Sequence, residues 1–488
     1  MHTSMQFESM PIAPGGDHLL GHNHAFRTDR MGTLRILSQA APAMMRLKLP
    51  FPGIRAVVLT TPEVVQEVLV EKAKAFDKSD MLRFSLQSLA GEGLFTSNGA
   101  LWRRQRKLMA PLFTPRALET YASDMVECAE RTIEGWSDGQ ALLLSAETTR
   151  LTMGIAGKTL FAADTFSEAD EIGQALTVAL EWTGWAIGRP YAVFHVMMRR
   201  LADGMAQRTH GKTRALFERA ERTFAGPTLA MGKRGRELAD AITFLDGYVQ
   251  KMIDDRRRTT ETQTDLLSRL LAARDVDDEE GGAPMTDRQV RDEVLTLFVA
   301  GHETTATGLA WTIYYACKNP EVYADLEREA DAVGDSPGVA DLGRLGHALR
   351  AFQEALRLMP PVYVFGRDSR MPVNIGGYDL PVRTNVLVSP WSLHHSNRIW
   401  PDAERFDPER FRPGREVGRH RYAYLPFGAG PRVCLGNHFA YMEAQLSIAV
   451  LLRRFRFELL GDDEPEPGAT LRPKHGLRVR VTRRKAIH

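Results

Sequence analysis

The stretch LPFGAGPRVCLGNHFA, Leu425 to Ala440, places one cysteine, Cys434, after two closely spaced glycines and an arginine. An apolar run with helical spacing follows it. The chain has only three cysteines, and the helix-like surroundings of Cys128 and Cys317 are explained by small buried side chains. Cys434 needs another explanation, because glycines at 428, 430 and 436 let the backbone curl closely around a ligand.

Several kinds of site contain a single cysteine in such a turn, and the plainest alternative is a glycine-rich turn that has no ligand. A dinucleotide-binding turn needs a third glycine where Val433 stands, after a clear strand. A zinc site needs further Cys or His ligands at set spacings, and a nucleophilic cysteine needs a partner base. Neither requirement is met in this stretch.

A thiolate ligand of iron explains more of the stretch. Backbone N–H groups and a helix N-terminus stabilise negative sulfur. Arg432, two residues before Cys434, is placed to pair with a negative group such as a haem propionate. Phe427, seven residues upstream, could lie on the sulfur side of the ring and limit the access of water.

Length and composition limit the number of domains and the class of protein. The chain has 488 residues, enough for one large domain or two or three ordinary ones. Hydrophobic residues make up 43% and charged residues 25%, as in an ordinary globular protein, and a net charge of +2 gives no reason to expect nucleic acid. The polar N-terminus predicts neither a signal peptide nor a membrane anchor, and the sparse cysteines favour a reducing compartment, the cytoplasm.

The periodicity of the chain predicts a mainly α fold with a minor β portion. Two short strands precede a helix that opens at Thr61-Pro62, and helical spacing dominates residues 101–330. The clearest helix runs from a capping box at Thr286 and Gln289 to Asn319-Pro320, about 48 Å at ~1.5 Å per residue. It is apolar on most sides and should cross the interior. Strands should follow at 455–460 and 477–484, separated by an acidic loop.

At every fixed position FGAGPRVC resembles FGxGxRxC, the haem-binding signature of the cytochrome P-450 superfamily. The resemblance implies that the Cys434 thiolate is the metal ligand of haem b, with Arg432 and Phe427 beside the cofactor. It also implies the cytochrome P-450 fold, in which a long central helix crosses over the haem. We expect an N-terminal flank over 1–24 and a single haem domain over 25–488.

The long helix carries AGHETT, 300–305, which resembles the oxygen-binding motif of that family. A polar patch on an exposed helix face is the plain alternative, but the flanking residues are apolar, and buried polar groups are costly unless they are used. By resemblance, Glu303 and Thr304 would be catalytic and relay protons during oxygen activation. Ala300 and Gly301 would lie against the haem, and Gly301 would let the helix distort.

Further motifs resemble the same family. Trp102 and Arg106, in WRRQR, share a helix face and match the WxxxR that holds a haem propionate. Arg367 falls where another propionate-binding arginine is often found. A final set, expected to stabilise the fold without touching substrate, consists of Glu354, Arg357 and Arg410.

The resemblance therefore implies a bacterial haem-thiolate monooxygenase that inserts one oxygen atom from O2 into a lipophilic small molecule. Its motif contexts are most similar to the fatty-acid- and terpenoid-hydroxylating branches. Electrons would come from a separate ferredoxin or flavodoxin with its reductase, and the protein would be a soluble monomer. Two rivals remain: a peroxide-driven or non-redox enzyme of the same fold, and a non-catalytic haem sensor or electron carrier.

Three parts of the chain should supply an apolar substrate pocket: the loop 81–95, Phe298 to Ala300, and residues 362–365.

One segment departs from the family pattern. Residues 188–234 exceed its usual loop at this place and are rich in Arg, Lys and Met. A solvated helical excursion explains them more simply than a membrane device.

Overall fold

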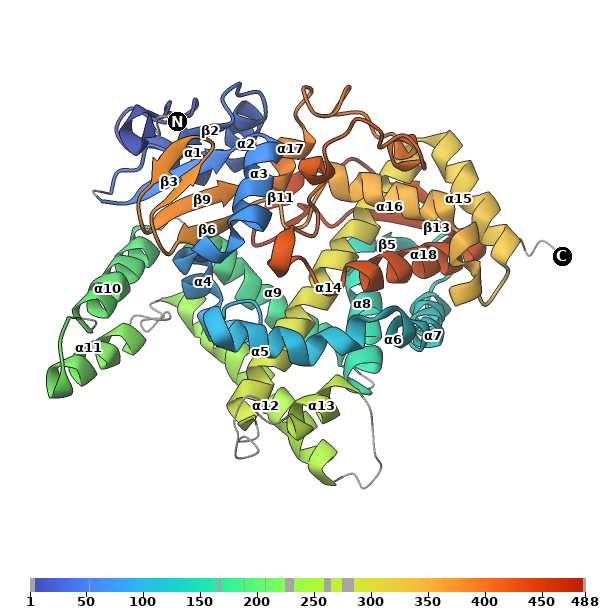
Figure 1. Cartoon of the computed structure of the whole chain (residues 1–488). Coiled ribbons are helices and arrows are strands. Elements are labelled where there is room, and N and C mark those ends of the chain that lie inside the picture. Colours follow the sequence, from blue (N-terminus) through green and yellow to red (C-terminus); the bar gives the residue numbers. More distant parts are fainter. Residues whose placement is uncertain are drawn as a thin grey trace.

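A computed structural model provides the coordinates of the chain. The structure describes residues 5–485 except 52, 164, 166–167, 188, 207, 224–231, 259–264 and 274–284. In this part of the chain helices predominate and strands form small sheets at the periphery (Figure 1). The predicted mainly α fold with a minor β portion is confirmed.

The helices of the first half lie mostly between residues 99 and 258. They are α1 (Gly21–Thr28), α2 (Arg30–Ser38), α3 (Pro62–Gln66), α4 (Asp80–Ala90), α5 (Gly99–Met109), α6 (Pro115–Glu119), α7 (Ala122–Glu134), α8 (Leu144–Phe161), α9 (Ala169–Ala186), α10 (Pro190–Ala206), α11 (Gly211–Thr223) and α12 (Lys233–Arg258). Those of the second half are α13 (Leu266–Ala272), α14 (Asp287–Lys318), α15 (Pro320–Val333), α16 (Gly346–Leu358), α17 (Pro390–His394) and α18 (Asn437–Arg454).

The strands build four sheets. The largest joins β2 (Met44–Arg46), β3 (Arg55–Leu59), β9 (Thr384–Val388), β6 (Phe365–Ser369) and β4 (Phe76–Lys78) in that order. The others are β1 (Met5–Gln6) with β8 (Tyr378–Leu380) and β7 (Val373–Ile375); β10 (Phe455–Leu459) with β13 (Arg478–Arg483) and β5 (Ala141–Leu143); and the pair β11 (Pro465–Pro467) and β12 (Leu471–Pro473). β10 and β13 are the two strands predicted near the C-terminus. The acidic loop predicted between them instead contains β11, because Glu466 pairs across to Arg472.

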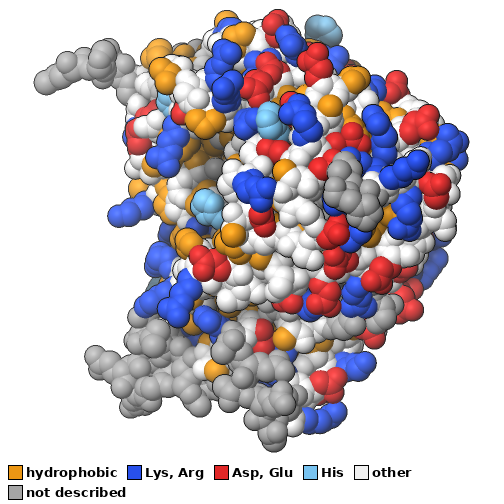
Figure 2. Space-filling model, turned by 90° about the vertical axis from the view of Figure 1, so that its right-hand side faces the viewer, with side chains coloured by type: hydrophobic (Ala, Val, Ile, Leu, Met, Phe, Trp, Pro, Cys, Tyr) orange, Lys and Arg blue, Asp and Glu red, His pale blue; other side chains and the backbone are white. Residues whose placement is uncertain are grey.

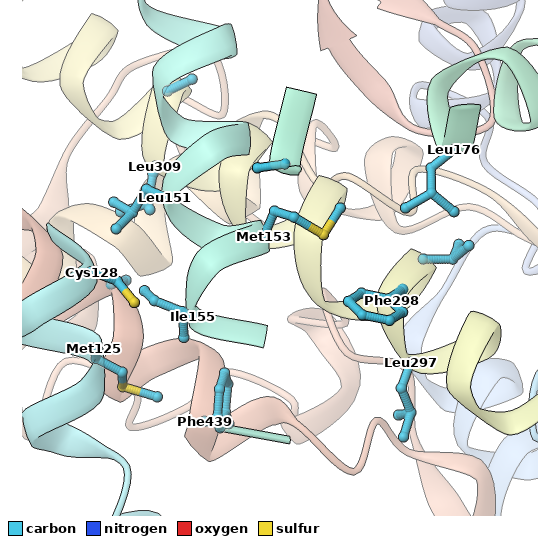
Figure 3. Packing of buried hydrophobic residues seen from close by; sticks show 14 of the residues in the cluster. Met125, Cys128, Leu151, Met153, Ile155, Leu176, Leu297, Phe298, Leu309 and Phe439 are labelled. Atoms are coloured by element: carbon cyan, nitrogen blue, oxygen red, sulfur yellow. The ribbon is translucent and has the colours of Figure 1, made fainter. Parts of the chain in front are cut away.

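Helix α14 is the long helix that the sequence predicts. Its N-terminus carries the predicted capping box, in which the Thr286 hydroxyl accepts from the Gln289 N–H and the Gln289 side chain accepts from the Thr286 N–H. Most of its residues are buried against α8, α12, α16 and α18. Figure 3 shows this packing, where Phe298 of α14 lies near Met153 of α8. The Phe298 ring stacks on Phe161 with 4.5 Å between centroids, so it belongs to the core, and its predicted place in the substrate pocket is not supported.

The predicted N-terminal flank packs onto the body. Met5 and Gln6 pair with Tyr378 and Asp379 of β8, and the Phe7 and Met10 side chains are buried. Helices α10 and α11 extend from the body in Figure 1 and agree with the expected helical excursion; residues 188, 207 and 224–231 of this segment lie outside the described part. No helix among the described residues is long and apolar enough to cross a membrane. On the face shown in Figure 2, acidic and basic side chains are interspersed, in keeping with the small net charge.

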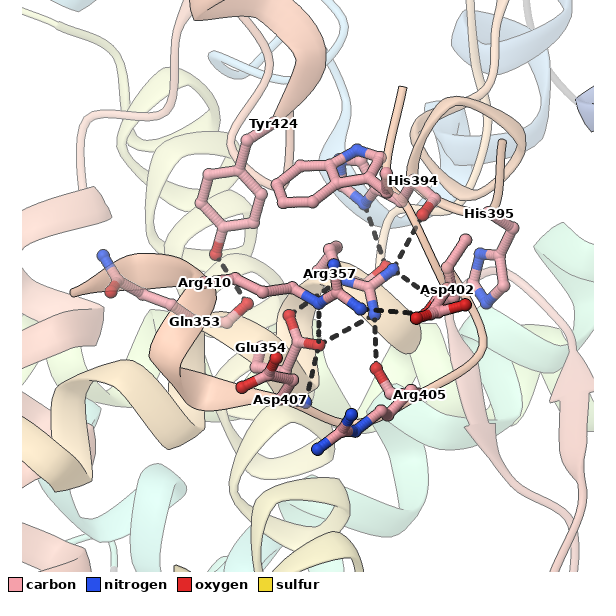
Figure 4. A network of polar contacts seen from close by, with 12 residues as sticks. Gln353, Glu354, Arg357, His394, His395, Asp402, Arg405, Asp407, Arg410 and Tyr424 are labelled. Atoms are coloured by element: carbon pink, nitrogen blue, oxygen red, sulfur yellow. Dashed lines mark hydrogen bonds and ion pairs between the residues drawn. The ribbon is translucent and has the colours of Figure 1, made fainter. Parts of the chain in front are cut away.

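A buried ion pair joins α16 to the segment that leads to Cys434 (Figure 4). Arg357 donates to both carboxylate oxygens of Glu354 at 2.7 and 2.8 Å, and both side chains are fully buried. The remaining donors of Arg357 reach backbone carbonyls of 394, 403 and 405, at 2.8, 2.7 and 3.1 Å. Arg410 lies 3.4 Å from Glu354, and the expected grouping of these three residues away from substrate is consistent with this geometry.

We expect Arg357→Ala to cost about 3–5 kcal/mol of unfolding free energy, because Glu354 would remain charged without its partner in the interior. Arg258→Ala is the control: it removes an ion pair of the same spacing, Arg258–Asp255, that is exposed and contributes less than about 1 kcal/mol. Denaturant unfolding of both variants measures the difference. Equal losses would contradict the structural role of the buried pair.

Candidate haem-thiolate site

The Cys434 loop is held by its own backbone. The Cys434 N–H donates to the Phe427 carbonyl at 3.0 Å, and a 3₁₀ turn over Gly430–Arg432 precedes the cysteine. Gly428 and Gly430 adopt φ values of +69° and +68°, which favour glycine. A Cβ on Gly430 would lie 1.9 Å from the Leu69 carbonyl oxygen, so this glycine also permits a close approach to the chain that precedes β4. Helix α18 begins at Asn437, three residues after the cysteine.

Cys434 lies deep in the protein, yet its side chain is accessible. This combination is expected of a side chain that faces a ligand site. Burial raises the pKa of the thiol, whereas the Gly436 backbone N–H and the positive charge of Arg106 lower that pKa. The surroundings therefore contain the two groups that a bound thiolate needs, a backbone donor and a cation. Phe427 packs edge-on against Tyr441 of α18, with 5.2 Å between ring centroids.

Helix α5 carries the predicted Trp102 and Arg106 to this loop. The Arg106 guanidinium donates to the Val433 carbonyl at 2.8 Å, directly before the cysteine. The Arg432 guanidinium carbon lies 4.5 Å from the centre of the Trp102 ring, and that of Arg106 lies 5.9 Å from it. Both distances are those of cation–π contacts, so the indole ring holds two cations beside the loop.

One buried and two half-buried cations, Lys78, Arg367 and Arg432, lie close together beside the loop. Arg367 of β6 lies directly opposite Lys78 of β4 in the sheet. Burial, Arg432 and Arg367 lower the pKa of Lys78 to about 6, and burial and Arg432 lower the pKa of Arg367 to about 10. Arg432 pairs with Asp77 at 3.1 Å. Among the described residues, the other terminal nitrogen of Arg432 is buried and finds no hydrogen-bond acceptor.

These features fit a haem. The Cys434 thiol would serve as a ligand of the haem iron, and the nearby cations would suit the two propionates, because anions among them would relieve the mutual repulsion that lowers these pKa values. In the described part of the chain no three His, Cys, Asp or Glu side chains gather as a metal-binding cluster, so a multi-ligand centre of that kind does not account for Cys434. The residues define the class of a haem-thiolate protein.

The four predicted residues of α14 lie on two faces of the helix. Ala300 and Thr304 are one turn apart, and the Thr304 hydroxyl donates to the Ala300 carbonyl at 2.6 Å. The helix continues unbroken through Gly301. Glu303 points elsewhere: its Oε1 accepts from the Thr470 hydroxyl at 2.9 Å. Among the described residues no direct hydrogen bond joins Glu303 to Thr304, so a proton that passes between them needs an intermediary or a side-chain movement.

Two residues that the sequence did not single out fix the loop 91–97 beside the site. Lys78 donates to the carbonyls of Leu94 and Ser97, and Leu94 N–H donates to Glu293 Oε2 at 3.0 Å. Burial raises the pKa of Glu293 to about 8. Nothing in the sequence points to either residue, because a lysine in a short strand and an acid in a long helix are common. Lys78 and Glu293 are also far apart in the chain and form no recognisable motif. Only the long-range packing brings Lys78 and Glu293 to the same loop.

Comparisons with known proteins agree with this geometry. The family model described as Cytochrome P450 matches residues 18–479. Cyclooctatin synthase of Streptomyces melanosporofaciens is 33% identical and covers 95% of this chain and 92% of its own. Pentalenene oxygenase of Streptomyces avermitilis is 30% identical, with 96% of each chain covered. The crystal structure of the cytochrome P450DA heme domain superposes with a TM-score of 0.78 at 25% identity over 98% of both chains. The chain therefore belongs to the cytochrome P450 family, and it is a haem-thiolate monooxygenase.

Gly430→Ala should destabilise the protein and reduce the haem it retains, because its Cβ would overlap the Leu69 carbonyl oxygen. Gly428→Ala is the matched control. It has nearly the same φ but no atom within 4 Å of the added Cβ, so it should cost only the backbone strain of about 1–2 kcal/mol. Haem absorbance per protein and the unfolding midpoint measure both effects. Equal haem retention in the two variants would show that the close approach at Leu69 does not matter.

Proposed function

We propose that this monooxygenase oxidises a lipophilic terpenoid, with Cys434 as the thiolate ligand of haem b. The observation that carries the site assignment is the accessible Cys434 thiol in a loop beside the buried Lys78 and the half-buried Arg367 and Arg432. When bound, a thiolate-ligated haem supplies the activation of O2, so that one oxygen atom enters the substrate and the other leaves as water.

Each predicted residue has a distinct task in this proposal. The backbone N–H of Gly436 and the charge of Arg106 stabilise the anionic sulfur. Arg432 and Arg367 hold the propionates, and Trp102 keeps the Arg432 guanidinium in place through its ring. Phe427 covers the sulfur side and limits the entry of water. Ala300 and Gly301 bring α14 close to the other side of the site.

Thr304 and Glu303 supply protons. The Thr304 hydroxyl is held by the Ala300 carbonyl and is placed to pass a proton on the inner face of α14. Burial raises the pKa of Glu303, which keeps a larger fraction of this carboxyl protonated near neutral pH than in water. A protonated carboxyl next to a hydroxyl in sequence is a suitable donor once its side chain turns toward Thr304.

The substrate class rests on the named relatives. Cyclooctatin synthase and cyclooctat-9-en-7-ol 5-monooxygenase are each 33% identical to this chain, and pentalenene oxygenase is 30% identical. All three cover at least 94% of it. Two of these names describe an oxygenase, and the three relatives modify terpenoids, so we place a terpenoid ahead of a fatty acid as the substrate of this protein.

We further propose a monomeric cytoplasmic protein in which residues 25–488 act as a single haem domain. A separate ferredoxin or flavodoxin with its reductase would deliver the electrons. Arg103 and Lys107, exposed on α5 beside the thiolate loop, suit an acidic donor of this kind. Arg419 does not belong to this exposed set, because it is partly buried and its guanidinium carbon lies 4.2 Å from the centre of the Trp400 ring.

Cys434→Ala should abolish the red-shifted absorption that carbon monoxide gives with the reduced haem-thiolate protein, because the axial sulfur is lost. Cys128→Ala and Cys317→Ala should keep that absorption, since burial raises the pKa of both thiols to about 12 and neither lies in the loop. Reduced-minus-oxidised spectra under carbon monoxide measure this. A normal spectrum in Cys434→Ala would overturn the ligand assignment.

Turnover of a panel of cyclic terpenes with NADPH and surrogate ferredoxin partners tests the activity. Thr304→Ala should lower product formed per electron by at least about tenfold, because a positioned proton-transfer group contributes about 10²–10⁴ in rate. Thr312→Ala is the control, since its hydroxyl makes the same bond to a carbonyl one turn earlier, Gly308, at 2.7 Å. Product with peroxide alone, rearranged product without electrons, or ligand binding without product would each favour a rival function.

A further inference from the structure

Two arginines lie against the ring of Trp185, near the end of α9, and a third lies close by. The guanidinium carbon of Arg189 is 5.0 Å from the ring centre, and that of Arg234 is 5.6 Å from it. Arg189 lies between α9 and α10, whereas Arg234 belongs to the first turn of α12. Arg27, in the last turn of α1, is near enough for its charge to lower the pKa of Arg189. The fold thus gathers an arginine cluster, Arg27, Arg189 and Arg234, around one indole ring.

No carboxylate neutralises the arginine cluster within the described residues. Burial lowers the pKa of Arg189, the charges of Arg27 and Arg234 lower it further, and no acidic group of the described part opposes them. The first turn of α12 contains no acidic residue, and neither does the segment 224–231 that precedes this helix in the sequence. Glu237, the first acid on α12, lies 3.7 Å from Lys233 and forms an ion pair with it. An anion bound among the three arginines would relieve their repulsion.

An apolar surface begins on α10, about one helical turn after Arg189. This helix extends from the body in Figure 1, and its residues Phe194, Met197 and Leu201 are 55%, 42% and 60% exposed. Steps of three and four residues place these side chains on one face, which we call the apolar face of α10. It is about 10 Å long at ~1.5 Å per residue. Exposed apolar side chains that gather on one face indicate a place where a ligand binds.

We propose that the arginine cluster binds the carboxylate or phosphate group of one lipophilic molecule, whose apolar part lies along the apolar face of α10. A single molecule fits better than a bilayer surface, because two of the cations converge on one indole ring instead of being spread over a plane. The proposal goes beyond the function proposed above, since it concerns the recognition of a charged group and requires no turnover.

The geometry of the cluster suits a carboxylate or a phosphate. A guanidinium is planar and can donate two parallel hydrogen bonds to either group. Contact of Arg189 and Arg234 with the Trp185 ring holds the two guanidiniums in place, and their N–H groups can still donate to a ligand. The cluster is separate from the cations beside Cys434, which belong to β4, β6 and the cysteine loop.

The first experiment compares farnesyl phosphate with farnesol, which have the same apolar chain and differ in the anionic group. Isothermal titration calorimetry with the haem-loaded protein should give at least about tenfold tighter binding of farnesyl phosphate, because hydrogen bonds to a charged group are the stronger ones. Arg189→Gln should remove most of this difference and leave the affinity for farnesol unchanged. Equal affinities for the two compounds in the unsubstituted protein would overturn the proposal.

Arg236→Gln is the matched control. Arg236 is exposed on the same turn of α12 as Arg234, but a step of two residues points it to a different side of the helix. This variant should keep the tight binding of farnesyl phosphate, whereas Arg234→Gln should lose it. Equal losses in both variants would mean general attraction to a basic surface and would overturn the proposal. Because each substitution removes a positive charge from a basic region, the unfolding midpoints should not fall, which shows that the variants are folded.

The second experiment tests the apolar face and the nature of the ligand. Leu201→Gln should weaken the binding of both farnesyl phosphate and farnesol, whereas Val417→Gln, at a residue that is 84% exposed on a distant loop, should weaken neither. Unchanged binding in Leu201→Gln would overturn the placement of the apolar part. Sedimentation with phosphatidylglycerol vesicles distinguishes a bilayer from a single ligand. Binding to these vesicles that depends on Arg189, without binding of soluble farnesyl phosphate, would overturn the proposal in favour of a membrane surface.

Discussion

The buried pair of Glu354 and Arg357 anchors the segment from which the cysteine loop is built. Two charges with no exposure are tolerated only when every donor and acceptor is used, and Arg357 uses its donors on Glu354 and on three carbonyls of the segment 394–405. This segment in turn holds the start of the cysteine loop, because the buried His394 ring accepts from the Leu425 N–H at 2.9 Å. Burial and the charge of Arg357 keep the pKa of His394 well below its usual value, so the ring is neutral and can act as this acceptor. The buried ion pair therefore fixes the start of the cysteine loop through Arg357 and His394, although Glu354 and Cys434 lie on different elements.

A second constraint is the excess of positive charge beside that loop. Lys78, Arg367 and Arg432 come from two strands and the loop itself, and Asp77 is the carboxylate that pairs with Arg432. An isolated protein would gain nothing from placing these cations together, since burial and repulsion disfavour their charged forms. Two haem propionates bound here would supply the missing negative charge, and binding of the cofactor would then stabilise this part of the fold. Lys78 also bonds the loop 91–97, so binding of haem propionates beside Lys78 would couple the order of that loop to the cofactor.

Helix α14 separates two environments. Thr304 donates to the carbonyl of Ala300, whereas Glu303 accepts from Thr470, so a single helix presents a hydroxyl and an acid to different surroundings. The core keeps these faces distinct, because Phe298 stacks on Phe161 and the rest of the helix is packed tightly.

Local spacing along the chain was sufficient to predict the long capped helix and the terminal strands, whereas the cysteine signature and the Glu354–Arg357 pair of α16 were predicted from their resemblance to motifs of the family. The helix and the strands show their characteristic periods in the sequence, and the turn at Gly430 needs a glycine because its φ is positive. Both kinds of requirement involve only residues that are close together in the chain. Long-range packing was needed to establish that Lys78 faces Arg367, that Thr470 holds Glu303, that Phe298 lies in the core and that β11 interrupts the acidic loop. Each of these contacts joins residues far apart in the chain or depends on strand register. The free energy of such a contact comes from burial and pairing in the folded molecule, so it cannot be predicted from the local propensities of the residues.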